Sequence, residues 1–411
     1  MLTDLEHRYL ASTGGVRVGV VCAVSMSMRA LLLPQIQAFQ RAGYEVCGIC
    51  SDGPEIPSLR ALGVPIFPLE ILREVAPFRD LKALLQMTRL LRKLRLDIVH
   101  MHTPKAMVVG MLGSILAKVP IRIITVHGFY FVNERSRLRR LFFKTLSITA
   151  CRCANFVFSQ SQEDLDMVWR ENLLLPERVQ YLGNGINLER FRRENYPADE
   201  GLRVRAQCGI PPDAYVVGIV ARLTRGKGFN ELFEALGSLR NKIPNIHLLH
   251  IGPIDSSRGS KERPEMAAEF GVQDICHFLG YREDVPRLMT AMDMLCLPSH
   301  REGFPRSVIE ACAMSLPPVV TDIRGSREAI SHGQTGLVVP LGDVPALADA
   351  IEQLYRDPDL RQTLGQAARQ QAEEAFDERR VFRAILWVYE QQLWRLNRTV
   401  PKSLPAPRRH A

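Results

Sequence analysis

A pair of glutamates in the second half of the chain, Glu302 and Glu310, has the residue type and spacing to bind one hydroxyl-rich ligand. Pro305 between them favours the first turn of a helix, which the sequence predicts to run to about Ser315. Helical rotation then separates the two carboxylates by about 80°, so they address different parts of one molecule. A carboxylate accepts two hydroxyls well, and a sugar or a ribose presents hydroxyls in pairs.

The surrounding elements should place Glu302 at the carboxyl end of a buried strand. Met294–Leu297 is apolar throughout and indicates a parallel strand, and Pro317 and Pro318 stop the helix before the next strand. Gly303 lets the loop backbone approach a ligand. The helix start behind it offers free N–H groups and a positive dipole end, so the stretch predicts an anion site beside Glu302.

Two cations, Arg222 and Lys227, follow a second predicted strand, Tyr215–Ala221, and precede a helix that begins at Gly228. This position suits a diphosphate, because fixed cations stabilise the charge that a departing nucleotide diphosphate develops. A solvated cluster of charges on the surface is the alternative interpretation.

Strand and helix signals alternate along both halves of the chain, which favours α/β domains with doubly wound parallel sheets. A polar segment, 192–200, is the predicted linker between the halves. The predicted strands cover residues 16–24, 44–50, 64–69, 97–101, 121–126, 156–159, 179–182, 215–221, 246–251, 275–279, 294–297, 318–321 and 336–339. The predicted helices cover residues 29–41, 81–94, 105–118, 136–150, 162–171, 228–240, 262–270, 305–315, 344–355, 359–374 and 378–396.

The stretch E-G-F-P-R-S-V-I-E-A, with T-D-I-R-G-S-R-E after it, resembles the E-x7-E signature of retaining glycosyltransferases of family 4 (glycosyl transferases group 1). N-G-I-N-L-E-R-F at 184–191 is similar to the segment before this family's interdomain linker. The resemblance implies the GT-B fold, with two Rossmann-like domains facing a cleft. Their expected bounds are 15–191 for the acceptor side and 201–375 for the nucleotide-sugar side, with a final helix, 376–397, crossing back to the first domain.

The resemblance also assigns roles to individual residues. Glu302 contacts hydroxyls of the transferred sugar and Glu310 contacts the ribose, while Arg222 and Lys227 hold the diphosphate. His127 follows a predicted strand at the place where similar enzymes have a histidine near the transferred sugar, so it contacts that sugar or assists deprotonation of the acceptor. The implied catalytic residues are His127, Glu302, Arg222 and Lys227, and the implied donor-binding residues are Arg222, Lys227, Tyr281, Arg282, Glu302, Gly303, Phe304, Pro305 and Glu310.

We therefore expect a retaining enzyme that moves a sugar from a nucleotide diphosphate, UDP above all, to a hydroxyl of a saccharide acceptor. V-H-M-H-T-P-K-A and T-V-H-G-F-Y-F in the first half resemble bacterial enzymes that extend lipid-linked, polyprenyl-borne saccharides. One alternative is a UDP-sugar epimerase of the same fold. A basic nucleic-acid-binding protein is the other, but 7% aromatic residues and no recognisable binding motif give it little support.

No cofactor or metal is expected. Asp164-Leu165-Asp166 is predicted to be helical and Asp357-Pro358-Asp359 to be a turn, so neither resembles a D-x-D metal site. His100 and His102 share a strand face without an evident third ligand, and we interpret them as structural. The family's glycine-rich loop after its first strand is replaced here by residues 25–29, where Arg29 at a helix start is the substitute for phosphate contact.

Composition indicates a cytoplasmic protein with an anionic partner. The nine cysteines lack framework spacing, no signal peptide is evident, and no apolar run is long enough to span a bilayer. The net charge is +9. Residues 128–144 combine loop aromatics, expected to be exposed, with five cations, and a helical wheel puts Leu138, Leu141, Phe142 and Thr145 on one face. This segment predicts reversible docking on an anionic inner membrane surface, with an ordinary core-packed helix as the alternative.

Overall fold

The computed structural model describes residues 3–12, 14–72, 76–134, 136–254, 263–398 and 401, and within it the chain forms two compact units. The first unit runs to Gly183 and includes the chain from Arg380 onward, and the second unit covers Asn184–Arg379. Ile186 and Phe191 are buried in the core of the second unit. The chain therefore enters that core before the expected boundary at residue 191.

The first unit contains a seven-stranded parallel sheet in the order β3-β2-β1-β4-β5-β6-β7. The order reverses between β1 and β4. β1 lies between β2 and β4, and its Val18 is opposite Val46 of β2 and Ile98 of β4. The strands are β1 (Arg17–Val21), β2 (Glu45–Cys50), β3 (Ile66–Pro68), β4 (Ile98–Met101), β5 (Ile121–Val126), β6 (Phe156–Ser159) and β7 (Val179–Tyr181).

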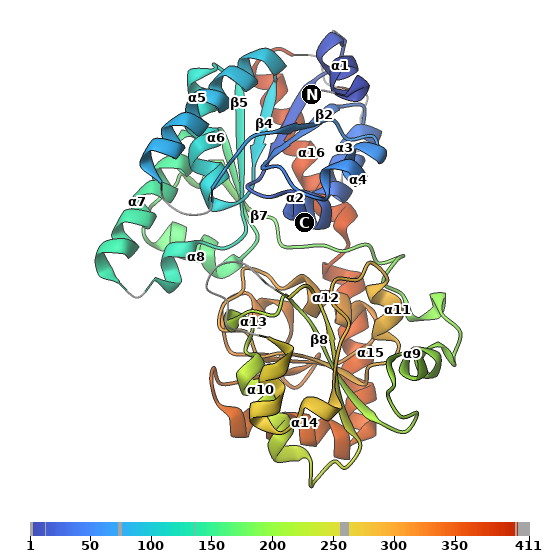
Figure 1. Cartoon of the computed structure of the whole chain (residues 1–411). Helices are drawn as coiled ribbons and strands as arrows, with labels where there is room; N and C mark the ends of the chain where they lie inside the picture. Colours follow the sequence, from blue (N-terminus) through green and yellow to red (C-terminus); the bar gives the residue numbers. More distant parts are fainter. Residues whose placement is uncertain are drawn as a thin grey trace. The chain divides into compact units, whose positions relative to one another are not determined.

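Helices cover both faces of this sheet (Figure 1). On one face lie α5 (Pro77–Leu94), α6 (Pro104–Leu116), α7 (Arg137–Cys153) and α8 (Gln162–Arg170). On the other lie α3 (Leu33–Arg41), α4 (Ile56–Ala61) and α16 (Glu378–Arg395), and the short α1 (Asp4–Ala11) and α2 (Ser25–Ser27) precede β1 and follow it. Tyr389 of α16 is buried with its ring against Phe39 and Tyr44, so the last helix is part of the first unit's core.

The second unit has a six-stranded parallel sheet in the order β10-β9-β8-β11-β12-β13, reversing between β8 and β11. Its strands are β8 (Tyr215–Val220), β9 (Ile246–Ile251), β10 (Cys276–Phe278), β11 (Met294–Leu297), β12 (Pro318–Thr321) and β13 (Leu337–Val339). Its helices are α9 (Glu200–Cys208), α10 (Phe229–Leu239), α11 (Val285–Met289), α12 (Arg306–Ala313), α13 (Ser326–Ala329), α14 (Val344–Arg356) and α15 (Pro358–Ala375). Ligands of such sheets bind outside the carboxyl ends of strands where the order reverses.

Some elements differ from their predicted form. The predicted helix 29–41 is a π-helical turn, Met28–Leu32, followed by α3, because Pro34 has no N–H to continue the preceding hydrogen-bond pattern. The predicted helix 262–270 is a 3₁₀ helix, Pro264–Phe270, and its first residue, Glu262, lies outside the described residues. The tail from Thr399 lies outside them too, apart from Pro401. None of the described helices has the length and hydropathy needed to cross a membrane.

Candidate active site

The loops after β8 and β11 contact each other where the strand order of the second unit reverses. The N–H of His300 donates to the carbonyl of Gly226 over 3.0 Å. Gly228 has a φ of 73°, and a Cβ there would lie 1.9 Å from the carbonyl oxygen of Pro298. Only glycine satisfies both the positive φ and this close approach, so the backbone itself holds the two loops together.

Lys227 and Glu302, which come from these two loops, form an ion pair. Nζ of Lys227 lies 2.6 Å from Oε1 of Glu302, and the side chains are 22% and 11% exposed. Arg222, on the same loop as Lys227, is exposed. The structure thus gathers a carboxylate and cations at one edge of the sheet, as a ligand with both hydroxyls and phosphates requires.

The helix α12 begins one residue later than predicted. Pro305 has a ψ of 108° and is the N-cap residue, so Arg306 is the first helical residue. The helix ends at Ala313 rather than near Ser315, because Ser315 itself has a left-handed φ of 58°. The free N–H groups at the start of α12 still follow directly after the loop that carries Glu302.

The loop between Glu302 and α12 is anchored from both sides. The ring of Phe304 is buried 5.8 Å from that of Phe376, and its carbonyl accepts from Nδ2 of Asn184 over 3.2 Å. A Cβ at Gly325, after β12, would lie 2.3 Å from the carbonyl oxygen of Gly303. Phe304 therefore holds this loop through packing, and Gly303 is the half-buried residue next to Glu302.

Glu310 lies on α12, with its side chain 15% exposed and Oε1 3.8 Å from Nε of Arg306. Burial raises the pKa of Glu310, while the positive charges of Arg306 and Arg190 lower it and offset part of that rise. Sequence reasoning missed both arginines as partners of this carboxylate. Arg306 stands four residues before Glu310, and residues four apart are neighbours on a helix, so the spacing could have indicated this partner. Arg190 belongs to the N-G-I-N-L-E-R-F segment, so the motif could have indicated the other.

Tyr281 and Arg282 lie on the loop after β10, which joins the same edge of the sheet. The N–H of Gly252, after β9, donates to the carbonyl of Gly280 over 2.8 Å. Tyr281 is 54% exposed. The Arg282 guanidinium makes two bonds of 2.7 and 2.8 Å to Asp284. Tyr281 and Arg282, both implied donor-binding residues, are thus exposed on this loop, and Arg282 is held by Asp284.

His127 follows β5 in the first unit and is half-buried. Its Nε2 lies 3.1 Å from Nδ1 of His102, and its Nδ1 lies 2.8 Å from Oε1 of Gln160. His100 is fully buried beside His102, as a structural histidine should be. Both ring nitrogens of His127 thus contact protein groups. A general base needs a ring nitrogen that can take the proton of the acceptor hydroxyl, so these contacts bear on whether His127 can act as one.

The segment that replaces the family's glycine-rich loop, 25–29, is tied to the sheet edge of the first unit. The Ser25 hydroxyl donates to Oε2 of Glu55 over 2.6 Å. A Cβ at Gly53 would lie 2.0 Å from Oγ of Ser25. Arg29 lies in the π-helical turn and is half-buried, so it does not stand at a regular helix start as predicted.

One aspartate of each acidic pair considered as a metal site has a structural partner. Asp164 is buried and accepts from the N–H of Phe129 over 2.9 Å, and Asp357 caps α15 by accepting from the N–H of Leu360 over 2.8 Å. In the part of the chain that the structure describes, no three His, Cys, Asp or Glu side chains are grouped to hold a metal ion.

The first half of α7 projects apolar side chains into solvent. Leu138 is 82%, Leu141 63% and Phe142 52% exposed, and Thr145 on the same face is exposed as well. Arg137, Arg139 and Arg140 are also exposed. The alternative of an ordinary core-packed helix face is therefore wrong for this part of α7.

The expectation that the aromatics before α7 are exposed is wrong for Phe129 and Phe131, and the side chain of Tyr130 lies outside the described residues. Phe129 is 6% and Phe131 3% exposed, and their rings pack 5.1 Å apart in the core of the first unit. The N–H of Phe129 is held by Asp164, which draws the loop inward. Arg135, one of the five predicted cations, lies outside the described residues. The exposed apolar surface thus lies on the helix, and Phe129 and Phe131 of the loop are not part of it.

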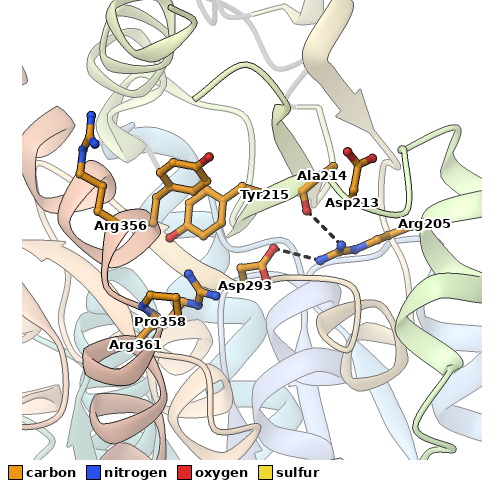
Figure 2. Close-up of a pocket in the computed structure, with 9 residues that line it drawn as sticks. Arg205, Asp213, Ala214, Tyr215, Asp293, Arg356, Pro358 and Arg361 are labelled. Atoms are coloured by element: carbon orange, nitrogen blue, oxygen red, sulfur yellow. Dashed lines mark hydrogen bonds and ion pairs between the residues drawn. The ribbon is translucent and has the colours of Figure 1, made fainter. Parts of the chain in front are cut away.

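A cavity of about 620 Å³ opens at the other edge of the second sheet, at the amino ends of β8 and β11 (Figure 2). Arg205 spans it, donating to Asp293 over 2.9 Å and to the carbonyl of Ala214 over 3.0 Å. Its other lining residues are Asp213, Tyr215, Tyr355, Arg356, Pro358 and Arg361. These contacts tie α9 to the sheet, and the cavity faces away from the strand ends that carry Glu302 and Lys227.

Family comparisons match both units. Residues 203–371 match the family described as "Glycosyl transferases group 1", and residues 27–185 match the "Glycosyl transferase 4-like domain". The first of these segments carries the paired loops and α12, and the second carries His127.

Individual relatives match over most of their length. The capsular polysaccharide biosynthesis glycosyltransferase CapM of Staphylococcus aureus is 28% identical over 363 residues, 87% of this chain and 93% of the relative. The UDP-Gal:alpha-D-GlcNAc-diphosphoundecaprenol alpha-1,3-galactosyltransferase of Escherichia coli is 28% identical over 332 residues, 79% and 84% of the two chains. The structure of Anabaena HepE with UDP and glucose superposes with a TM-score of 0.77 at 20% identity, covering 92% of this chain and 100% of that one, which shows a shared fold.

Proposed function

Since this chain is a GT-B glycosyltransferase that belongs to the group 1 family, with a 4-like first domain, we propose that it is a retaining enzyme that uses a UDP-sugar. Its acceptor is a hydroxyl of a lipid-linked saccharide in bacterial polysaccharide synthesis. The observation that carries the proposal is the Lys227–Glu302 pair beside the start of α12, where the strand order reverses. The acceptor class is supported by the undecaprenol-linked substrate named for the Escherichia coli relative.

The donor diphosphate would lie at the start of α12 with Arg222 and Lys227 around it. Its arrival gives Lys227 a phosphate partner in place of, or beside, Glu302, and frees a carboxylate oxygen for sugar hydroxyls. Glu310 accepts the ribose hydroxyls, and the exposed Tyr281 ring offers a surface to the base. Each group of the donor thus has a residue of matching chemistry on one unit.

In the transfer itself, the bond between the sugar's anomeric carbon and the diphosphate oxygen breaks while the acceptor oxygen bonds to the same face of that carbon. The leaving diphosphate oxygen takes the acceptor's proton, so UDP and the extended saccharide are the products. Arg222, Lys227 and the α12 N–H groups stabilise the negative charge that builds on the leaving group. No other base is needed for proton balance.

The test is an incubation of the protein with a panel of UDP- and GDP-sugars, with and without an undecaprenyl-diphosphate-linked saccharide. We expect UDP release with one UDP-sugar, dependent on the acceptor, and a product with the donor's anomeric configuration. Conversion of a UDP-sugar to its epimer without acceptor would favour the epimerase alternative. A product of inverted configuration would contradict the retaining mechanism.

We also propose that the enzyme docks reversibly on the inner face of the cytoplasmic membrane through α7. Exposed leucines and a phenylalanine lie among exposed arginines there, a combination typical of helices that bind an anionic interface. Docking would bring the first unit to the surface at which a lipid-linked acceptor presents its sugar.

A further inference from the structure

Three histidines meet at the carboxyl ends of β4 and β5 in the first unit. His100 and His102 are 0% and 1% exposed, and their rings stack with centroids 4.3 Å apart. His102 and His127 follow as the next pair, with centroids 5.4 Å apart. Such a cluster tolerates little positive charge, because each added proton is buried next to another imidazole.

The hydrogen-bond partners of His100 and the burial of His102 indicate that both imidazole rings are neutral. The nitrogens of His100 lie 2.7 Å from the hydroxyls of Tyr389 and Thr125. Burial lowers the pKa of His100 to about 3, and burial with the neighbouring histidines holds the pKa of His102 well below its ordinary value. Each neutral ring carries one N–H, so the heavy-atom partners decide which nitrogen bears it.

Gln160 decides the tautomer of His127. Its carbonyl oxygen lies 2.8 Å from Nδ1 of His127, so in a neutral ring Nδ1 carries the proton and Nε2 is bare. The bare Nε2 accepts from Nδ1–H of His102 over 3.1 Å. This leaves Nε2 of His102 as a bare, buried nitrogen, and among the described residues it has no hydrogen-bond partner. If His102 carried its proton on Nε2 instead, that buried N–H would have no hydrogen-bond partner, which is the rarer and less favourable case.

We propose that His102 is a positioning residue that, with Gln160, locks His127 as the neutral Nδ1–H tautomer. The proposal depends on the proposed function in one respect, which is the expectation that His127 contacts the donor sugar. With both nitrogens engaged, His127 is a fixed neutral ring and not the base for the acceptor. This agrees with a route in which the leaving diphosphate takes the acceptor's proton.

The first experiment needs no substrate. Nitrogen NMR of the full chain labelled with ¹⁵N-histidine distinguishes protonated from bare ring nitrogens, and the resonances of His127 are identified by their loss in His127→Asn. We expect Nδ1 of His127 to be protonated and Nε2 bare at neutral pH. A proton on Nε2, or on both nitrogens, in the parent protein would overturn the proposal, whatever any variant does.

Three substitutions then test the role of His102. His102→Phe removes the donor, and we expect His127 to gain mixed tautomers. His102→Asn keeps an N–H at the position of Nδ1 and should restore the parent's spectrum. His100→Phe is the matched control, because His100 is equally buried but has no hydrogen bond to His127. If the tautomers of His127 become mixed in His100→Phe as much as in His102→Phe, the cause is a general loosening of the packing around the histidines, and the proposal is wrong.

Activity gives a separate readout. We expect His102→Phe to lower kcat roughly tenfold, the lower end of the loss that follows when a metal-bound histidine loses the partner that orients it. Binding of free UDP should be unchanged, because the residues assigned to the nucleotide lie in the second unit, and His102→Asn should recover most of kcat. If the parent transfers no sugar, the proposed function fails while the tautomer result stands. If the tautomer is wrong, this inference fails even in an active enzyme.

Discussion

At the scale of residues, the two glutamates of the E-x7-E stretch have different surroundings. Glu302 is paired with Lys227, whereas Glu310 is mostly buried near Arg306 on α12. In the proposed function, Glu302 contacts the transferred sugar beside the diphosphate and Glu310 contacts the ribose. Glu302 should therefore affect sugar transfer, and Glu310 should affect binding of the nucleotide. The structure therefore predicts separable effects for substitutions at the two positions.

Glu310→Ala is expected to weaken binding of UDP about tenfold or more, because hydrogen bonds to a charged acceptor contribute roughly 1.5–3 kcal/mol. Glu302→Gln should bind UDP within about threefold of the parent and should mainly lower kcat. Titration calorimetry with free UDP measures the first effect, and a transfer assay measures the second. Parent-like UDP affinity in Glu310→Ala would remove the ribose assignment.

Gly228→Ala tests the contact between the two loops. We expect it to lower the free energy of unfolding by about 2 kcal/mol or more, since alanine is strained at a φ of 73° and its Cβ would meet the Pro298 carbonyl. Gly226→Ala is the matched control on the same loop, because a Cβ there has no atom within 4 Å. Urea unfolding without ligand compares the two. Equal losses in both variants would mean that the loop contact does not constrain Gly228.

At the scale of elements, the first half of α7 combines exposed apolar side chains with exposed arginines. Its second half is buried through Ile148 and Cys151, while its first half exposes Leu138 and Leu141. A soluble surface does not need large apolar groups clustered with arginines. The helix is thus anchored in the core at one end and free to contact a bilayer at the other.

Arg137→Ala/Arg139→Ala/Arg140→Ala is expected to reduce cosedimentation with anionic liposomes by as much as about 100-fold, at about 1 kcal/mol for each cation. UDP binding should be intact, and high salt should weaken binding of the parent. The control Arg203→Ala/Arg356→Ala/Arg379→Ala removes the same charge from exposed arginines of the second unit. Equal loss in both triple variants, or equal binding of the parent to neutral vesicles, would exclude α7 as the docking element.

At the scale of the whole molecule, the proposed chemistry depends on protein cations and helix N–H groups to stabilise the leaving diphosphate. We therefore predict that sugar transfer survives excess EDTA with less than about a twofold change. The measurement is the initial rate with and without chelator, followed by added magnesium or manganese. A rate abolished by EDTA and restored by either ion would show that a metal takes part in leaving-group stabilisation.

The sequence by itself determined the fold class and the neighbourhood of the site. Apolar runs alternating with amphipathic segments predict parallel sheets, and the residues after each strand must then gather at one edge, as Lys227 and Glu302 do. It also predicted the face of α7 that carries Leu138, Leu141 and Phe142, because helical periodicity is a local property.

Only the tertiary structure decided what each side chain touches. Phe129 and Phe131 are in a loop, yet Asp164, 35 residues after Phe129, draws that loop into the core. The tautomer of His127 depends on His102 and Gln160, which directly follow β4 and β6. Burial and hydrogen-bond partners come from segments distant along the chain, whereas periodicity and spacing report only on neighbours, so contacts of this kind follow from the packed fold alone.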